Sequence, residues 1–244
     1  MKDLLQDLLS HTAQLGGVDL IKIIGTKEET SIVTKDSANT VMIYGKFKNI
    51  QPQFIGTFGM PNIQKLRNIL SFEEYDDPST ISMTCRVENG VQTTTPETFH
   101  FETKEKDFVN EYRLMSEDII NKLMNFDFAG TTYAIEWVPK IASIQRLKKQ
   151  STACGDDLFF KAKMVGTELR FYLGDEANHS ANFVFETEFV GTMRHTWDFP
   201  LKFFIGILDF VGDKKIYISD SGLMKITIDS GIADYEYLIP GSAN

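Results

Sequence analysis

The sequence of 244 residues has only two cysteines, Cys85 and Cys154, and they lie far apart. Two isolated cysteines in a chain of this length fit a reducing compartment better than a disulfide scaffold. Apolar runs are also short, and none reaches the ~18 residues needed to span a membrane. Residues 1–5 carry charge within their apolar pattern and have no cleavage-type end, so we expect no signal peptide and no secretion.

Residues suited to catalysis are scarce and scattered. The four histidines do not show metal-ligand spacing, and the sequence has no glycine-rich loop of the phosphate-binding type. Cys154 lies in a polar stretch that indicates a turn rather than a nucleophile. We therefore expect no enzymatic activity, no catalytic residue, no metal and no cofactor. A hydrolase that uses dispersed histidines and aspartates is the weakest alternative.

Basic residues are outnumbered, 25 against 34 acidic ones, yet they gather in three segments of a chain whose net charge is −9. Each segment begins with a proline and shows apolar residues at helical spacing, so residues 61–71, 139–149 and 200–209 predict helices. Proline suits the first helical turn, where its missing N–H costs nothing. The predicted apolar faces of the first two helices are Ile63, Leu66, Ile69 and Leu70, then Ile141, Ile144 and Leu147.

These three helices carry seven basic residues and one acid, Asp209, whereas the rest of the chain has 18 basic and 33 acidic residues. The asymmetry predicts a polyanion that touches one surface only. A basic helix face is more commonly a solvated face, and that alternative stays open.

The remaining pattern predicts short strands separated by turns. A further helix with apolar residues at Leu4, Leu5, Leu8, Leu9 and Leu15 opens the chain, with a mixed polar face that includes Lys2 and His11. A short helical patch follows Ser116. The expected strands are residues 20–24, 31–34, 40–47, 54–58, 81–87, 98–103, 108–115, 158–165, 168–173, 181–189 and 191–197, followed by two hairpins that turn near 220–222 and 229–231. The two halves thus repeat one plan of helix, strands, helix, strands, which indicates an internal duplication.

Four stretches resemble a known family when they are taken in order. Residues 110–115, followed by acids, resemble the entrance to an interdomain connector, and Tyr-Leu-Ile-Pro at 237–240 resembles a terminal Tyr-Leu-Ala-Pro. Residues 34–39 resemble a loop beside a partner pocket, and the proline-led basic helices resemble helices that line a ring. The chain resembles the sliding clamps typified by proliferating cell nuclear antigen and the clamps of T4-like phages.

The resemblance implies an α+β sliding-clamp fold with two topologically similar domains, at residues 1–108 and 131–244, joined by a connector at 109–130. Three chains would close a homotrimeric ring around duplex DNA, with helices inside and an acidic exterior. The clamp would tether a replicative polymerase and act as its processivity factor. Lys and Arg on the inner helices attract phosphates without reading bases, which suits a protein that slides.

The resemblance also assigns site residues. Subunits would join by pairing edge strands, residues 106–114 of one chain with 178–187 of the next. Partner peptides would dock in an apolar pocket under the connector. The expected DNA-binding residues are Lys65, Arg67, Lys140, Arg146, Lys148, Lys149 and Lys202. The expected interface residues are Phe108, Tyr112, Asn182 and Val184, and the expected pocket residues are Asn39, Thr40, Ile119, Leu123, Met124, Tyr237, Ile239 and Pro240.

The expected partners are double-stranded DNA, a DNA polymerase C-terminal peptide, a clamp-loader ATPase and further copies of this chain, with no membrane. The missing acidic tail after Pro240 suggests a viral form, which would work in the cytoplasm of a phage-infected bacterial host. The main alternative is a non-enzymatic viral β-rich structural or adaptor protein whose basic helices bind an acidic partner.

Overall fold

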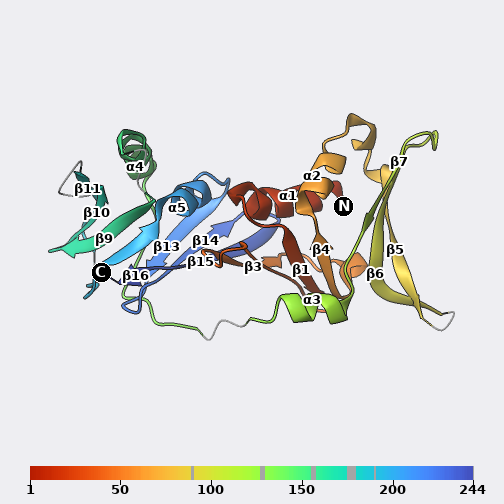
Figure 1. Ribbon diagram of the computed structural model, residues 1–244, viewed down its shortest axis with the longest axis horizontal. Coiled ribbons are helices and arrows are strands. Elements are labelled where there is room, and N and C mark those ends of the chain that lie inside the picture. Colours follow the sequence, from red (N-terminus) through yellow and green to blue (C-terminus); the bar gives the residue numbers. More distant parts are fainter. Residues whose placement is uncertain (89–90, 127–129, 155–157, 175–179, 190, 244) are drawn as a thin grey trace. The chain divides into compact units, whose positions relative to one another are not determined.

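The computed structural model describes residues 1–88, 91–126, 130–154, 158–174, 180–189 and 191–243 (Figure 1). The chain divides into two compact units. Unit 1 comprises Met1–Asp127 and Ser230–Tyr235, and unit 2 comprises Phe128–Asp229 and Glu236–Asn244. The segment expected as a connector, residues 109–130, contributes a strand and a helix to unit 1, and the expected domain bounds stay a prediction.

Unit 1 begins with helix α1 and contains two antiparallel groups of strands. The first group has the order β4-β1-β2-β3, and the second has the order β5-β6-β7. Helix α2 connects the two groups, and α3 follows β7. The bounds are α1 Lys2–Thr12, β1 Leu20–Gly25, β2 Thr30–Lys35, β3 Met42–Phe47, β4 Gly56–Pro61, α2 Ile63–Leu70, β5 Ile81–Glu88, β6 Val91–Glu102, β7 Val109–Arg113 and α3 Glu117–Leu123.

Unit 2 repeats the order helix, four strands, helix, three strands; one more strand, β8, precedes it, and it ends in strand β16 where unit 1 ends in helix α3. Its two groups have the orders β11-β10-β9-β12-β16 and β15-β14-β13-β8. The bounds are β8 Ile135–Trp137, α4 Ile141–Ala153, β9 Phe159–Val165, β10 Glu168–Gly174, β11 Ser180–Glu186, β12 Trp197–Pro200, α5 Leu201–Leu208, β13 Asp213–Ile218, β14 Leu223–Asp229, β15 Ala233–Pro240 and β16 Ser242–Ala243.

The strand registers confirm the internal duplication. In unit 1, β1 pairs with β2 and β4, and β2 pairs with β3; in unit 2, β9 pairs with β10 and β12, and β10 pairs with β11. The chain also returns to the same place after the last strand of each repeat. Met115 bridges to Gly59 of β4, and Ser242 pairs with Asp198 of β12. The two halves are therefore alike in topology, which the order of elements predicted.

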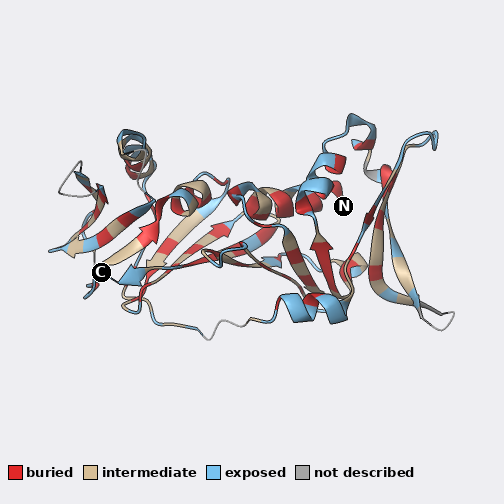
Figure 2. Ribbon diagram, in the orientation of Figure 1, coloured by how far each residue is buried: buried red, intermediate tan, exposed pale blue. Residues whose placement is uncertain are grey.

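Alternating side chains build the core of each unit, because successive residues of a strand point to opposite faces. Figure 2 shows this alternation along β9 and β10. In unit 2 an aromatic cluster fills the space between strands and α5: the ring of Phe171 lies 4.6 Å from Phe160, 4.3 Å from Phe185 and 5.8 Å from Phe204. Each fully buried phenylalanine contributes roughly 1.5–3 kcal/mol relative to an exposed one.

The buried faces predicted for the basic helices are confirmed for α2 and partly wrong for α4. All four predicted apolar residues of α2 are buried, and its polar residues at 64, 65, 67 and 68 are exposed. In α4 the predicted face is wrong at Ile141, whose side chain is 74% exposed, since only Ser143 and Leu147 are buried. Pro139 precedes the N-cap Lys140 rather than occupying the first turn, because the helix starts two residues later.

Other predictions also need correction. Lys2 and His11 are buried rather than solvated, because Lys2 Nζ reaches the carbonyl oxygen of Tyr75 at 3.1 Å and the His11 ring stacks on Tyr235 at 4.8 Å. No strand covers the described residues 191–196, where the chain runs as a loop into β12. Residues 52–54 form a 3₁₀ turn, so β4 begins at Gly56 and not at Phe54.

Candidate nucleic-acid and partner surfaces

Helices α1 and α2 pack together in unit 1, and a cavity of about 210 Å³ lined by both polar and apolar side chains lies beside them. Arg67 is the basic residue of its lining, and the lining has no acid. The lining residues are Gln6, Leu9, Ser10, Gln14, Arg67, Leu70 and Ser71. Gln6 of α1 and Gln14, which follows that helix, lie in the same lining as Arg67. No sequence pattern predicts this arrangement, since it depends on how two helices pack.

The seven predicted DNA-binding side chains divide into two sets. In the described part of the chain, Lys65, Arg67, Lys149 and Lys202 are exposed and have no ion-pair partner. The other three bind this chain's own groups. Lys140 pairs with Glu186, Lys148 pairs with Asp209, and Arg146 Nη1 donates to the carbonyl oxygen of Val184 at 3.0 Å.

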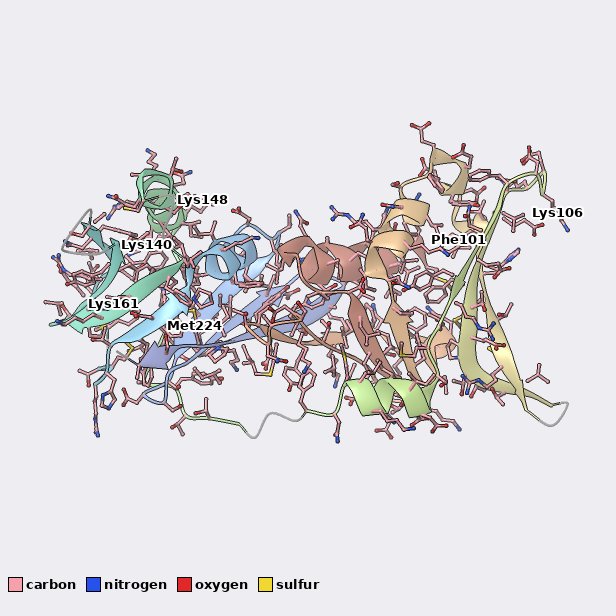
Figure 3. All side chains as sticks on the ribbon, viewed as in Figure 1. Phe101, Lys106, Lys140, Lys148, Lys161 and Met224 are labelled. Carbon is pink, nitrogen blue, oxygen red and sulfur yellow. The ribbon has the colours of Figure 1, made fainter. Side chains whose placement is uncertain are left out.

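Helix α4 and its N-cap carry both partnered and unpartnered cations, and the partnered Lys140 and Lys148 are labelled in Figure 3. Lys140 at its start reaches Glu186 on β11, and Lys148 near its end reaches Asp209 just after α5. These pairs connect α4 to β11 and α5, which compensates for the small apolar face of the helix. The Lys148–Asp209 pair is exposed on both sides and contributes about 0–1 kcal/mol, whereas the Glu186 side chain is only 8% exposed. The number of basic residues counted in the sequence is therefore larger than the number of α4 side chains that are free to bind an external polyanion.

Two surfaces of unit 1 carry the predicted pocket residues. Asn39 and Thr40 follow the turn after β2, which a buried Asp36 holds by accepting hydrogen bonds from the amides of Val41 at 2.9 Å and Ala38 at 3.3 Å. On α3, Ile119 and Leu123 are 50% and 54% exposed, whereas Met124 is buried. Exposed leucine and isoleucine on one short helix form an apolar surface that a peptide can cover.

The segment after α3 lies on strands of unit 1 through contacts that the sequence did not suggest. Lys22 Nζ donates to the carbonyl oxygen of Met124 at 3.2 Å. Lys35 Nζ lies 5.2 Å from the centre of the Phe126 ring, and the ring of Tyr44 lies 6.0 Å from the same ring. Cation–π and edge-to-face contacts thus hold Phe126 next to the turn that carries Asn39.

The remaining pocket residues belong to unit 2, and two of them have no exposed surface. Tyr237 and Ile239 are fully buried on β15, and the Tyr237 ring packs 5.7 Å from Phe210, while Pro240 is exposed. Their expected role as pocket lining stays a prediction. They are core residues of unit 2.

The strands expected to join subunits are both edge strands. β7 ends the group β5-β6-β7, and β11 ends the group that starts β11-β10-β9. Phe108, Asn182 and Val184 are at least partly accessible, but Tyr112 is 2% exposed and its hydroxyl donates to the carbonyl oxygen of Pro61. Burial raises the pKa of the Tyr112 phenol well above its usual range. Tyr112 is thus a core residue whose main chain alone can take part in an interface. Asn178 lies outside the described residues.

Comparison with solved structures identifies the fold. The chain superposes on a structure described as "C-terminal region of FEN-1 bound to A. fulgidus PCNA", with a TM-score of 0.65 and 14% sequence identity, over 100% of this chain and 96% of that one. No protein-family model and no curated protein matches by sequence.

This chain has the sliding-clamp fold.

Within the clamp fold, the edge strand β7 bears a small titratable cluster. Nδ1 of His100 on β6 lies 2.6 Å from Glu111 on β7, and Nε2 lies 3.4 Å from Glu102. The hydrogen bond to Glu111 raises the pKa of His100, with Glu102 adding to it. Among the described residues, no three His, Cys, Asp or Glu side chains gather as a metal site would need. No helix in that part of the chain is long and apolar enough to cross a membrane.

Proposed function

We propose that this protein is a DNA sliding clamp, a processivity factor that encircles duplex DNA as a homotrimer and tethers a replicative polymerase. The observation that carries the proposal is the duplicated clamp topology, which presents a pair of helices in each unit. Four basic residues that have no ion-pair partner among the described residues lie on these helices: Lys65 and Arg67 on α2, Lys149 on α4 and Lys202 on α5. Four dispersed cations suit weak, sequence-independent contacts with phosphates.

The proposed ring closes by pairing β7 of one chain with β11 of the next. Both are edge strands with unpaired main-chain groups, which form a template for another chain. The carbonyl oxygen of Val184 on β11 already accepts a hydrogen bond from Arg146. An incoming strand must share or replace this bond, so we propose a trimer that forms at higher concentration and dissociates on dilution.

Mass measurement tests the assembly. Sedimentation or light scattering at increasing protein concentration should approach about 83 kDa, three times the 27.7 kDa of one chain. Encirclement is tested on DNA: cross-linked trimers should stay on a closed circular duplex during gel filtration in high salt and leave it after linearisation. A chain that stays at 27.7 kDa at all concentrations, or that leaves circles and linear DNA equally, contradicts the proposal.

Partner peptides, on this proposal, dock on the apolar surface of α3. FEN-1 is the partner named in the similar PCNA structure, and for this chain we propose the C-terminal peptide of a polymerase. We expect this surface to favour peptides with acidic or aromatic residues, because Lys35 and Tyr44 supply a cationic and an aromatic group around Phe126, which follows α3. A clamp-loader ATPase and a phage-infected bacterial host belong to the same proposal. A viral adaptor protein that uses these helices to bind an acidic partner remains the alternative, and the circular-DNA experiment separates the two.

The Leu123→Asp variant should bind this polymerase peptide at least tenfold more weakly, because it places a charge in the apolar contact. Its free energy of unfolding should change by less than about 0.5 kcal/mol, since Leu123 is 54% exposed. The matched control is Asn121→Asp, which adds the same charge at another exposed position of α3. Fluorescence anisotropy of a labelled peptide measures both variants. Equal weakening by the two would place the peptide elsewhere.

A further inference from the structure

The two repeats differ at one edge. In unit 2, β13 pairs on one side with β14 and on the other with the three-residue strand β8, in the register Ile216–Trp137, Tyr217–Glu136 and Ile218–Ile135. The corresponding strand of unit 1 is β5, which pairs only with β6 in the part of the chain that the structure describes. Figure 1 shows β5, in yellow, at the end of its sheet. The first repeat thus lacks a covering strand where the second has one.

The main-chain hydrogen bonds of this sheet show which N–H and C=O groups of β5 are left open. The amide of Leu114 donates to the carbonyl oxygen of Glu97, and the amide of Thr103 donates to that of Phe108. Odd-numbered residues at this end of β6 therefore direct their main-chain groups toward β7, and Thr98 and His100 direct theirs toward β5. Their register partners Thr84 and Ser82 complete that ladder.

It follows that the N–H and C=O groups of Ile81 and Met83 point away from β6, along the free edge. Unit 2 has the same geometry with the edge filled, because the carbonyl oxygen of Ile218 accepts a hydrogen bond from the amide of Ala134 at 2.8 Å. The ladder between β5 and β6 is regular from Ile81 to Thr84, and its first irregularity comes after Thr84. A bulge of this kind limits pairing beyond it. The open edge is therefore short and well defined.

The side chains of β5 also suit an added strand. Residues 81, 83, 85 and 87 are Ile, Met, Cys and Val, and they alternate with Ser, Thr and Arg. Exposure rises along this apolar side, from 7% at Ile81 to 62% at Val87, with Met83 half-buried. In unit 2 the covering strand has the pattern apolar–polar–apolar, with Ile135 and Trp137 buried and Glu136 exposed.

We propose that the free edge of β5, at Ile81 and Met83, binds an extended segment of a partner protein that has this apolar–polar–apolar pattern. The segment adds as an antiparallel strand, as β8 does on β13. Main-chain hydrogen bonds supply part of the affinity, and the two apolar side chains supply selectivity. This surface is separate from α3 and from the β7 edge, and the proposal does not depend on the clamp activity.

The probe that tests it is a synthetic peptide of residues 133–138 of this chain, Tyr-Ala-Ile-Glu-Trp-Val, flanked by lysines for solubility. Titrated into the ¹⁵N-labelled protein, it should shift the amide signals of residues 81–84 and slow hydrogen exchange at Met83. A peptide with serine in place of the Ile and Trp should leave these signals unchanged. Shifts confined to other residues, or none at millimolar peptide, would overturn the proposal.

Two variants sharpen the test. Met83→Pro removes the outward N–H at an edge position, where proline is tolerated, and should weaken peptide binding at least tenfold. Met83→Leu keeps the N–H and the apolar side chain and should bind within twofold of the parent. If Met83→Pro does not fold, the parent protein is titrated with peptides N-methylated either at the Ile and Trp or at the Glu. Loss only with the first peptide supports edge pairing, and equal binding of both refutes it.

Discussion

Replacing Lys149 and Lys202 by glutamate should lower the affinity of this protein for short duplex DNA at least tenfold at low salt. Both side chains are exposed, lie on α4 and α5, and have no ion-pair partner in the described part of the chain. If each neutralises one phosphate, the slope of log affinity against log salt should flatten by about 2, since each contact contributes roughly 0.9. Fluorescence anisotropy across a salt series measures both quantities.

The matched control is the pair Lys161→Glu and Lys163→Glu on β9. Their neighbours Phe160 and Ala162 are buried, and Phe160 packs 4.8 Å from Phe204 of α5. The two lysines therefore point to the sheet face away from α5 (Lys161 is labelled in Figure 3), and they carry no ion pair among the described residues. This control changes the net charge of the protein by the same amount, so it reproduces any long-range effect.

The control pair should weaken DNA binding less than threefold and leave the salt slope unchanged. Adding Lys65→Glu and Arg67→Glu to the helix pair should remove measurable binding, because the four unpartnered cations on α2, α4 and α5 are then reversed. Equal losses from the helix and sheet pairs would mean that net charge, and not the helix surface, governs binding. That result would remove the main electrostatic support for encirclement.

Replacing Asp7 by alanine should lower the free energy of unfolding by about 3 kcal/mol, the largest stability effect that we expect from one polar residue. The side chain of Asp7 is 9% exposed and joins parts of unit 1 that are far apart in sequence. Its Oδ2 accepts a hydrogen bond from the Tyr235 hydroxyl at 2.8 Å and lies 3.1 Å from the Ser230 hydroxyl. Without the carboxylate, the hydroxyl of the buried Tyr235 loses this acceptor, and the Ser230 hydroxyl keeps the carbonyl oxygen of Ala233 at 3.0 Å.

Urea denaturation followed by circular dichroism measures this loss. The control is Asp3→Ala on the same helix, where the residue is exposed and contributes less than about 1 kcal/mol through the helix dipole. Tyr235→Phe should fall between the two, at about 1 kcal/mol, because it removes one donor and keeps the ring that stacks on His11. If Asp7→Ala costs no more than Asp3→Ala, the three-residue link does not stabilise the fold.

Helix and strand periodicity carried most of the fold prediction. The apolar spacing of α2 defined its buried face, and the two hairpins closed where glycine was expected, with positive φ at Gly222 and Gly231. The strand predicted over residues 191–196 is wrong, because this segment is a loop despite its strand-like composition. The predicted burial of Ile141 is wrong because α4 contacts β11 largely through polar groups. Long-range contacts decide both cases, and a local pattern does not contain them.

The candidate sites were predictable as segments but not as individual side chains. The sequence pointed to α2, α4 and α5 and to the segment after β7. It did not reveal that Lys148 is paired with Asp209, that Phe126 lies against Lys35, or that Tyr237 is buried. Each of these facts is a contact between residues that are distant in sequence, so it exists only once the chain has folded.

By itself the sequence determined the repeated order of elements and the placement of cations on helices, because both follow from local spacing and composition. Only the tertiary structure decided which cations remain available and which edges remain open. Lys140 and Lys148 form ion pairs within the chain. Strand β8 pairs with the edge of β13, whereas the same edge of β5 has no paired strand among the described residues. Charge and hydrogen-bonding capacity are properties of residues, whereas their availability depends on what packs beside them.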